Sequence, residues 1–163
     1  MTDNMMLGID PGYDRLGWAI GSMQGRKLVV SEYGSIETDR ARSIFERYDT
    51  ILQNLDNLLN RFKPTELAIE TLFFSSNKTT ALRVSEVRGV IIGACLSKEL
   101  SIHEYNPTQI KQIAAGSGRA DKQMIAKMIA LQTKIEVRDT LDDAIDAVAV
   151  LLTHSLLRNS QLI

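Results

Sequence analysis

The sequence has little of what would place a protein in a membrane or in an oxidising compartment. Cys95 is the only cysteine, so no intramolecular disulfide can form, and a thiol-based metal site is not expected. Because Cys95 lies in the apolar run 90–96, we interpret it as a small core residue, which indicates a reducing environment. No apolar run is long enough to span a membrane, and the polar start, residues 1–4, does not resemble a signal peptide. We therefore expect a cytoplasmic protein without a membrane partner.

The chain also lacks a large net charge of either sign. Its formal charge is −1, which at first argues against a nucleic-acid partner. The distribution of charge along the chain argues for such a partner. Two segments are basic, with four basic residues against one acidic residue in each of 75–98 and 106–128. One segment is acidic, with five acidic residues against one basic residue in 136–146. Acids that hold cations beside bases that hold phosphates suit a metal-dependent nuclease. Ordinary solvated faces would explain the same charges.

Length and hydrophobic patterning predict one domain, residues 1–163, built on a mixed α/β sheet with helices on both faces. Strands are expected where short apolar runs end at turn residues, and helices where apolar residues recur every three or four positions. The predicted strands are 5–10, 16–20, 27–36, 67–70 and 102–105, with a hairpin loop at 21–25. The predicted helices are 44–62, 79–99, 107–115, 121–131 and 141–157.

Four acidic residues interrupt segments that should otherwise be buried. Asp10 and Glu70 each end a short apolar run, and Asp143 and Asp146 lie in an otherwise apolar helix. A carboxylate at the edge of a core is costly unless it is paired or binds a cation. Two strand-end acids and two acids on one helix face suit a hard cation of the Mg²⁺ or Mn²⁺ type. Two such ions can catalyse phosphoryl transfer.

Each of these motifs also has a simpler explanation. The glycine-rich segment 8–12 could be a plain hairpin, or the phosphate loop of actin-like ATPases and sugar kinases, although those proteins need a much longer chain. A lone Glu70 at a strand end is weak evidence, since most such residues are solvated. Asp139 or Thr140 could cap the last helix, with acids in its first turn favouring the helix dipole. Capping explains Asp146 poorly, because Asp146 lies two turns into that helix.

Histidine catalysis is not expected. His103 lies in a predicted strand and His154 in the last apolar helix. Neither has a nearby nucleophile, so we interpret both as structural residues.

The order and spacing of the motifs resemble the RuvC family of bacterial crossover-junction endodeoxyribonucleases. The matching motifs are Gly8-Ile9-Asp10-Pro11-Gly12, Ala68-Ile69-Glu70, Lys111-Gln112, Gly116-Ser117-Gly118-Arg119-Ala120-Asp121-Lys122, Asp143-Ala144-Ile145-Asp146-Ala147 and Thr153-His154. They cover nearly the whole chain, and their combination is specific. The resemblance implies a ribonuclease-H-like fold, with a five-stranded mixed sheet flanked by helices. It also implies a homodimer that nicks four-way Holliday junctions symmetrically in recombination and repair.

The resemblance further implies roles for individual residues. The implied metal ligands are Asp10, Glu70, Asp143 and Asp146, which would hold two Mg²⁺ ions per subunit, with Mn²⁺ as a substitute. Lys111 and Lys122 would act on phosphates at the reaction centre. The other expected DNA contacts are Phe73, which would reach the junction centre, its neighbour Phe74, and the basic residues Lys78, Arg83 and Arg119. The implied partners are the junction-binding protein RuvA and the branch-migration motor RuvB.

The sequence leaves open the third metal ligand, the dimer interface and the exact function. Asp142 is a second candidate ligand beside Asp143, although Asp139 as N-cap would give Asp142 a capping-box role and leave Asp143 as the ligand. The apolar face of helix 79–99 is the candidate dimer interface. The alternative functions are a related nuclease for structured RNA of the YqgF-like type, a non-catalytic junction-binding module, and the ATPase.

Overall fold

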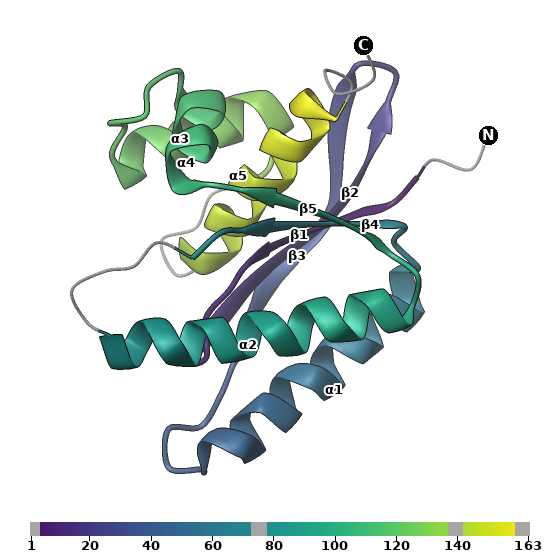
Figure 1. The fold of residues 1–163 in the computed structure, drawn as a ribbon. Coiled ribbons are helices and arrows are strands. Elements are labelled where there is room, and N and C mark those ends of the chain that lie inside the picture. The colour runs from purple at the N-terminus through teal and green to yellow at the C-terminus, as the bar shows by residue number, and fades with distance from the viewer. Residues whose placement is uncertain (1–3, 73–77, 137–141, 159–163) are drawn as a thin grey trace.

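The computed structural model describes residues 4–72, 78–136 and 142–158. In this part of the chain, helices pack against a five-stranded sheet of order β3-β2-β1-β4-β5 (Figure 1). The strands are β1 (Met6–Asp10), β2 (Arg15–Gln24), β3 (Lys27–Glu37), β4 (Glu66–Glu70) and β5 (Ser101–Tyr105). The helices are α1 (Ile44–Phe62), α2 (Lys78–Ser97), α3 (Pro107–Ala115), α4 (Lys122–Thr133) and α5 (Asp142–Leu157). Within the described ranges, none of the helices has the length and apolar character needed to cross a membrane.

The sheet is mixed, as predicted, with β1 at its centre. β1 pairs antiparallel with β2 and parallel with β4. β2 pairs antiparallel with β3, and β4 pairs parallel with β5. The antiparallel neighbours are joined by short connections, whereas the parallel pair β4 and β5 is joined by α2, because parallel strands need a long crossover.

Helices cover both faces of the sheet (Figure 1). α1 and α2 pack on one face, and α5 packs on the other with α3 and α4 beside it. Alternation along β1 divides its residues between the two cores: Leu7 and Ile9 face α1 and α2, whereas Met6 and Gly8 face α5. Asp10 continues the α5 side of this alternation. The period of two therefore assigns a strand-end acid to the face that α5 covers.

Local sequence signals set several helix ends. Ser43 caps α1 in a reciprocal capping box with Glu46, and Lys63 closes the helix in a left-handed conformation. Asn106 caps α3, and Asp121 caps α4 by accepting from a backbone N–H three residues on. α1 and α3 therefore begin and end at the predicted residues.

The first hairpin is longer than predicted. Instead of a loop at 21–25, β2 continues to Gln24, and the turn forms at Gly25, whose φ is 62°. Gly21 lies inside the strand, where an added Cβ would lie 2.6 Å from the Val29 carbonyl oxygen of β3 and 3.2 Å from Leu151 Cδ2 of α5. Gly21 is thus needed for the close approach of β3 and α5 and not for a turn.

The apolar face that the sequence predicts for helix 79–99 comprises Leu82, Val84, Val87, Ile91, Cys95 and Leu96, and it is only partly buried. Val87, Ile91 and Cys95 are buried, but Leu82 and Leu96 have 62% and 56% of their surface exposed. These two leucines lie outside the core, whereas Ile92 and Ala94 pack partly against it.

Candidate active site

Asp10 and Glu70 lie at the ends of adjacent parallel strands. Ile9 of β1 pairs with Ile69 of β4, so the next residue of each strand reaches the same edge of the sheet. There the two carboxyl groups lie close enough for each to shift the pKa of the other. Arg88 of α2 donates from Nε to the Glu70 backbone carbonyl oxygen at 3.1 Å and so holds this strand end. The sequence gives no signal for that contact, because Arg88 counts there only as one basic residue among several.

α5 brings Asp143 and Asp146 towards the same edge, because two glycines let the helix lie close to the sheet. A Cβ on Gly8 would lie 2.7 Å from the Ala147 carbonyl oxygen, and a Cβ on Gly17 would lie 1.8 Å from the Asp143 carbonyl oxygen. A larger residue at either position would push the start of α5 away. Both glycines lie within strands, inside the predicted ranges 5–10 and 16–20, but the local sequence carries no signal for their contact with α5.

The carboxyl groups at this edge form one electrostatic unit. Burial, followed by the charges of Glu70 and Asp146, raises the pKa of Asp10 to about 9. Burial also raises the pKa of Glu70 and the pKa of Asp146 above their usual values. Like charges in a desolvated site disfavour ionisation of one another. The negative charge of the ionised carboxylates therefore exceeds the positive charge beside them.

A divalent cation with hard oxygen ligands fits this donor set. Such a cation would offset both the burial and the mutual repulsion of the carboxylates. Oxygen ligands without imidazole or thiolate favour Mg²⁺ or Mn²⁺ over softer metals. Asp143 acts on both Asp10 and Asp146, whereas Asp142 is more exposed and acts on Asp146 after Asp143, which favours Asp143 as the ligand. Asp139, the predicted N-cap, lies outside the described residues.

Two lysines from separate helices approach the acids. Lys122 of α4 places Nζ 3.8 Å from Asp146 Oδ2. Lys111 of α3 acts on Glu70, whose pKa its charge lowers against the larger effect of burial. All four side chains line a pocket of about 320 Å³. Because 74% of the Lys122 side chain is exposed, its ammonium group is available to a phosphate that enters the pocket.

Arg15 is a charged neighbour of the acids and is absent from the residues predicted for the site. Its Nη1 lies 3.6 Å from Asp143 Oδ2, and with Lys122 it lines a second pocket of about 420 Å³. The turn before it is held by the buried Arg47, which donates from Nη2 to the Tyr13 carbonyl oxygen at 2.9 Å. The one available signal in the sequence is a basic residue just after the acid-bearing turn.

The other predicted DNA contacts are more scattered. Lys78 is exposed at the start of α2, and Arg119 is exposed just before α4. Arg83 forms an ion pair within α2 at 2.8 Å. Phe73 and Phe74 lie outside the described residues. The roles of all five stay predictions.

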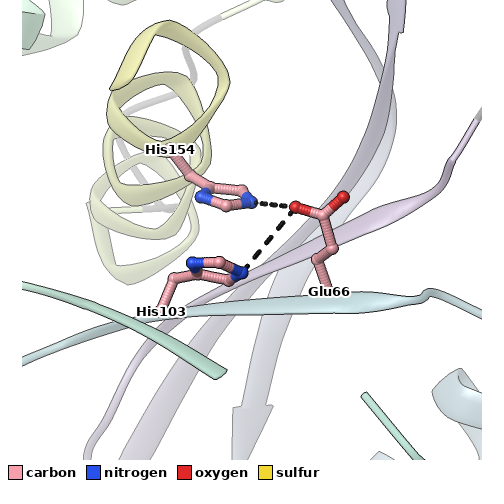
Figure 2. Close-up of side chains that lie close together, drawn as sticks. All are labelled: Glu66, His103 and His154. Atoms are coloured by element: carbon pink, nitrogen blue, oxygen red, sulfur yellow. Dashed lines mark hydrogen bonds and ion pairs between the residues drawn. The ribbon is translucent and has the colours of Figure 1, made fainter. Parts of the chain in front are cut away.

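A second group of titratable side chains lies at the other end of β4 and comprises Glu66, His103 and His154 (Figure 2). His154 Nε2 lies 2.7 Å from Glu66 Oε2, and His103 Nε2 lies 3.9 Å from the same oxygen. The donor atoms lie within 4.8 Å of one another, a spacing that could hold a metal ion. Arg158, however, already forms an ion pair with the other Glu66 oxygen at 2.8 Å. Burial lowers the pKa of His154, so the imidazole is neutral, as suits the structural role predicted for it.

Comparison with known proteins places these features in a family. The family model for the crossover junction endodeoxyribonuclease RuvC matches residues 6–154. The chain belongs to the RuvC family. A RuvC from Petrotoga mobilis is 42% identical over 157 residues, which is 96% of each chain. A RuvC from Heliobacterium modesticaldum is 40% identical over 154 residues, covering 93% of this chain and 95% of the relative.

A solved RuvC structure agrees with this assignment. Thermus thermophilus RuvC in complex with a Holliday junction substrate superposes with a TM-score of 0.89 at 27% identity, covering 97% of this chain and 96% of that one. Membership of the RuvC family confirms the predicted ribonuclease-H-like fold and the predicted endonuclease class. It also implies that the enzyme depends on a divalent metal.

Proposed function

We propose that this protein resolves four-way (Holliday) DNA junctions by paired symmetric nicks, in homologous recombination and DNA repair. The observation that carries the proposal is the meeting of Asp10, Glu70 and Asp146 at one sheet edge, with Lys122 beside them, in a RuvC-family chain. The junction-bound Thermus structure supports the choice of substrate. We take residues 1–163 to form a single nuclease domain.

The acids would hold the catalytic metal. We assign two Mg²⁺ ions per subunit, which Mn²⁺ could replace, to Asp10, Glu70, Asp143 and Asp146. When bound, the ions supply a hydroxide nucleophile from water and stabilise the leaving 3′ oxygen. Strands β1 and β4 fix two of the ligands, and α5 fixes the other two, so the geometry of the site depends on how α5 sits on the sheet.

The two lysines would bind phosphate oxygens at the site of cleavage. Lys111 and Lys122 come from α3 and α4 and line one pocket with Glu70 and Asp146. A positive charge held at this place stabilises the extra negative charge that develops on the phosphate in the transition state. We therefore assign both lysines to catalysis as well as to DNA binding.

The arms of the junction would lie against basic residues outside the pocket. Lys78, Arg83 and Arg119 are assigned to contacts with the DNA backbone, which add affinity without sequence preference. Phe73 or its neighbour Phe74 is assigned to stacking on an unpaired base near the crossover, because stacking needs only the face of the base.

A symmetric junction calls for two active sites, so we propose a C₂ homodimer. α2 supplies a candidate interface, since Leu82, Gly89, Gly93 and Leu96 recur at the spacing of one helix face. Both leucines are exposed, and a Cβ on either glycine would meet no atom within 4 Å, so a second helix can approach closely. Light scattering at micromolar concentration should give a dimer mass. A monomer mass that does not change on junction binding would contradict the proposal.

RuvA and RuvB are proposed as partners in the cytoplasm. The support is the family assignment alone, because no contact with either protein is visible in the described residues. Co-purification of the three proteins on an immobilised four-way junction would test it.

The function is tested by nicking of a synthetic four-way junction in the presence of Mg²⁺. A linear duplex of the same sequence and a folded RNA serve as matched substrates. We expect paired nicks at symmetric positions of the junction and little cleavage of the controls. Efficient cleavage of the RNA with an intact junction would replace the proposal with an RNA-processing function.

A further inference from the structure

The end of α5 that lies away from the acids is anchored by a buried polar chain. His154 is fully buried, and its Nδ1 lies 2.8 Å from the Tyr105 hydroxyl oxygen. Its Nε2 lies 2.7 Å from Glu66 Oε2 (Figure 2). With the proton on Nε2, His154 donates to Glu66 and accepts from Tyr105, so both ring nitrogens are satisfied. Arg158, just after α5, forms an ion pair with the second Glu66 oxygen.

The distance from this hydrogen-bonded group to the active site is about the same along β4 as along α5. Glu66 and Glu70 are the first and last residues of β4, about 13 Å apart at the usual strand rise. Asp146 and His154 lie eight residues apart on α5, about 12 Å at the usual helix rise. The helix runs against the direction of the strand, so Asp146 meets the site of Glu70 while His154 meets Glu66. One position of the helix along the sheet satisfies both ends.

We propose that Tyr105, His154 and Glu66 are positioning residues that fix α5 along the sheet and thereby set the distance of Asp143 and Asp146 from the strand-end acids. This inference rests on the proposed function. Apolar contact is non-directional, and the surface under α5 is lined with glycine and alanine at Gly8, Gly17, Ala19 and Gly21. Such a surface restricts the height of the helix above the sheet more than its position along the sheet. Directional hydrogen bonds from a buried imidazole supply the missing restraint.

Tyr105 also links the two ends of the α5 contact, the end at the strand-end acids and the end at His154. It pairs with Glu70 across β4 and β5, and its carbonyl oxygen accepts from the Thr71 N–H at 2.8 Å. Its backbone is therefore fixed beside one metal ligand, while its hydroxyl contacts the helix that carries two others. A catalytic metal site tolerates errors of only about 0.5 Å in ligand position, and a slip of α5 by one residue would move its acids by about 1.5 Å.

The competing interpretation is a metal site made by Glu66, His103 and His154. The 2.7 Å contact between His154 and Glu66 leaves no room for an ion between those two atoms, and Arg158 adds a positive charge at the same carboxylate. His103 lies 3.9 Å from Glu66, beyond hydrogen-bond distance. The hydrogen-bonded chain needs no cation, so we favour positioning.

Tyr105→Phe tests the proposal by removing one hydroxyl group. The matched control is Thr153→Val, which removes a buried hydroxyl from the same helix, where it donates only to the Ala149 carbonyl oxygen within α5. Two readouts are compared: the Mg²⁺ concentration that half-saturates nicking, and the Mg²⁺ concentration that half-saturates the rise in thermal midpoint. We expect Tyr105→Phe to raise both by about 10- to 100-fold, the usual effect of losing support for metal ligands. Thr153→Val should leave both within about twofold of wild type.

Glu66→Gln and Glu66→Leu provide a second comparison that does not depend on Tyr105. Glutamine keeps an oxygen acceptor for His154 and should retain near-wild-type Mg²⁺ dependence, whereas leucine should not. Equal Mg²⁺ half-saturation in Tyr105→Phe and Thr153→Val would overturn the proposal. So would stoichiometric Zn²⁺ binding to Asp10→Asn protein that His103→Ala abolishes. If the wild type shows a Mg²⁺-dependent thermal midpoint but no junction nicking, the proposed function fails while the thermal comparison still decides the inference.

Discussion

The two faces of the sheet are built in different ways. On one face, α1 and α2 each bury a stripe of apolar side chains and leave the rest exposed, including Phe45 and Leu82. On the other face, α5 is buried over most of its circumference and touches the sheet through backbone at Gly8 and Gly17. Apolar stripes tolerate small changes in helix height, whereas backbone contact does not. The proposed chemistry lies on the face where the height of the helix above the sheet is restricted most.

The largest effect on cleavage is expected from a change at Asp10. Asp10→Asn should abolish junction cleavage, because it removes one proposed metal ligand at nearly constant shape, while junction binding is largely retained. Nicking rates and band-shift affinities at saturating Mg²⁺ check this. A parallel loss of affinity and cleavage would point to a folding or DNA-contact role instead.

The same variant should change how stability depends on pH when no metal is present. The pKa of Asp10 rises from 3.8 to about 9 in the folded protein, so the folded state binds more protons than the unfolded state between those values. Stability of the metal-free wild type should therefore fall as the pH rises through this window. Asp10→Asn should weaken that dependence and raise metal-free stability near pH 8. Urea unfolding in a chelating buffer at several pH values measures both.

A glycine comparison separates the two faces directly. Gly17→Ala would place a Cβ 1.8 Å from the Asp143 carbonyl oxygen, so it should cost about 2–3 kcal/mol of stability and most of the cleavage activity. Gly89→Ala on α2 meets no atom within 4 Å and should not lower the denaturant midpoint; because Gly89 lies in the proposed dimer interface, its stability is the control and its cleavage is not. Denaturant midpoints and nicking rates decide, and an active, stable Gly17→Ala variant would show that α5 can shift without loss.

The lysines should give a smaller effect. Lys122→Ala should lower the nicking rate by about 100-fold and affect junction affinity less, because its charge matters most in the transition state. Lys111→Ala should behave in the same way. Single-turnover rates and affinities over a range of salt concentrations distinguish catalysis from binding. If each variant only weakens affinity and flattens its salt dependence by about one ion, both lysines are backbone contacts.

The smallest effect is expected for Asp142→Asn, and it distinguishes Asp142 from its neighbour Asp143 on α5. Asp142 is exposed, whereas Asp143 is half-buried and acts on both Asp10 and Asp146. Asp142→Asn should cost roughly 0.5–1 kcal/mol as a helix-terminus change and retain cleavage. Asp143→Asn should retain or raise metal-free stability and lose cleavage. An inactive Asp142→Asn beside an active Asp143→Asn would reverse the assignment.

The sequence alone predicts five strands and five helices close to those found, although β2 is longer, and it identifies Asp10, Glu70, Asp143 and Asp146 as candidate ligands. Period-two and period-3.6 patterns follow from backbone geometry, and caps such as Ser43 and Asn106 act within one turn, so each can be inferred from neighbouring residues. The family motifs added the pairing of residues that lie far apart in the chain.

Which side chains meet is visible only in the folded chain. Gly17 and Gly21 contact a helix more than a hundred residues away, so the local pattern places Gly17 in a strand and Gly21 in a loop without indicating either contact. Arg15 reaches Asp143, and His154 reaches Tyr105 and Glu66, for the same reason. Close packing and buried hydrogen bonds are made between elements, and they depend on distances that no single segment of the sequence contains.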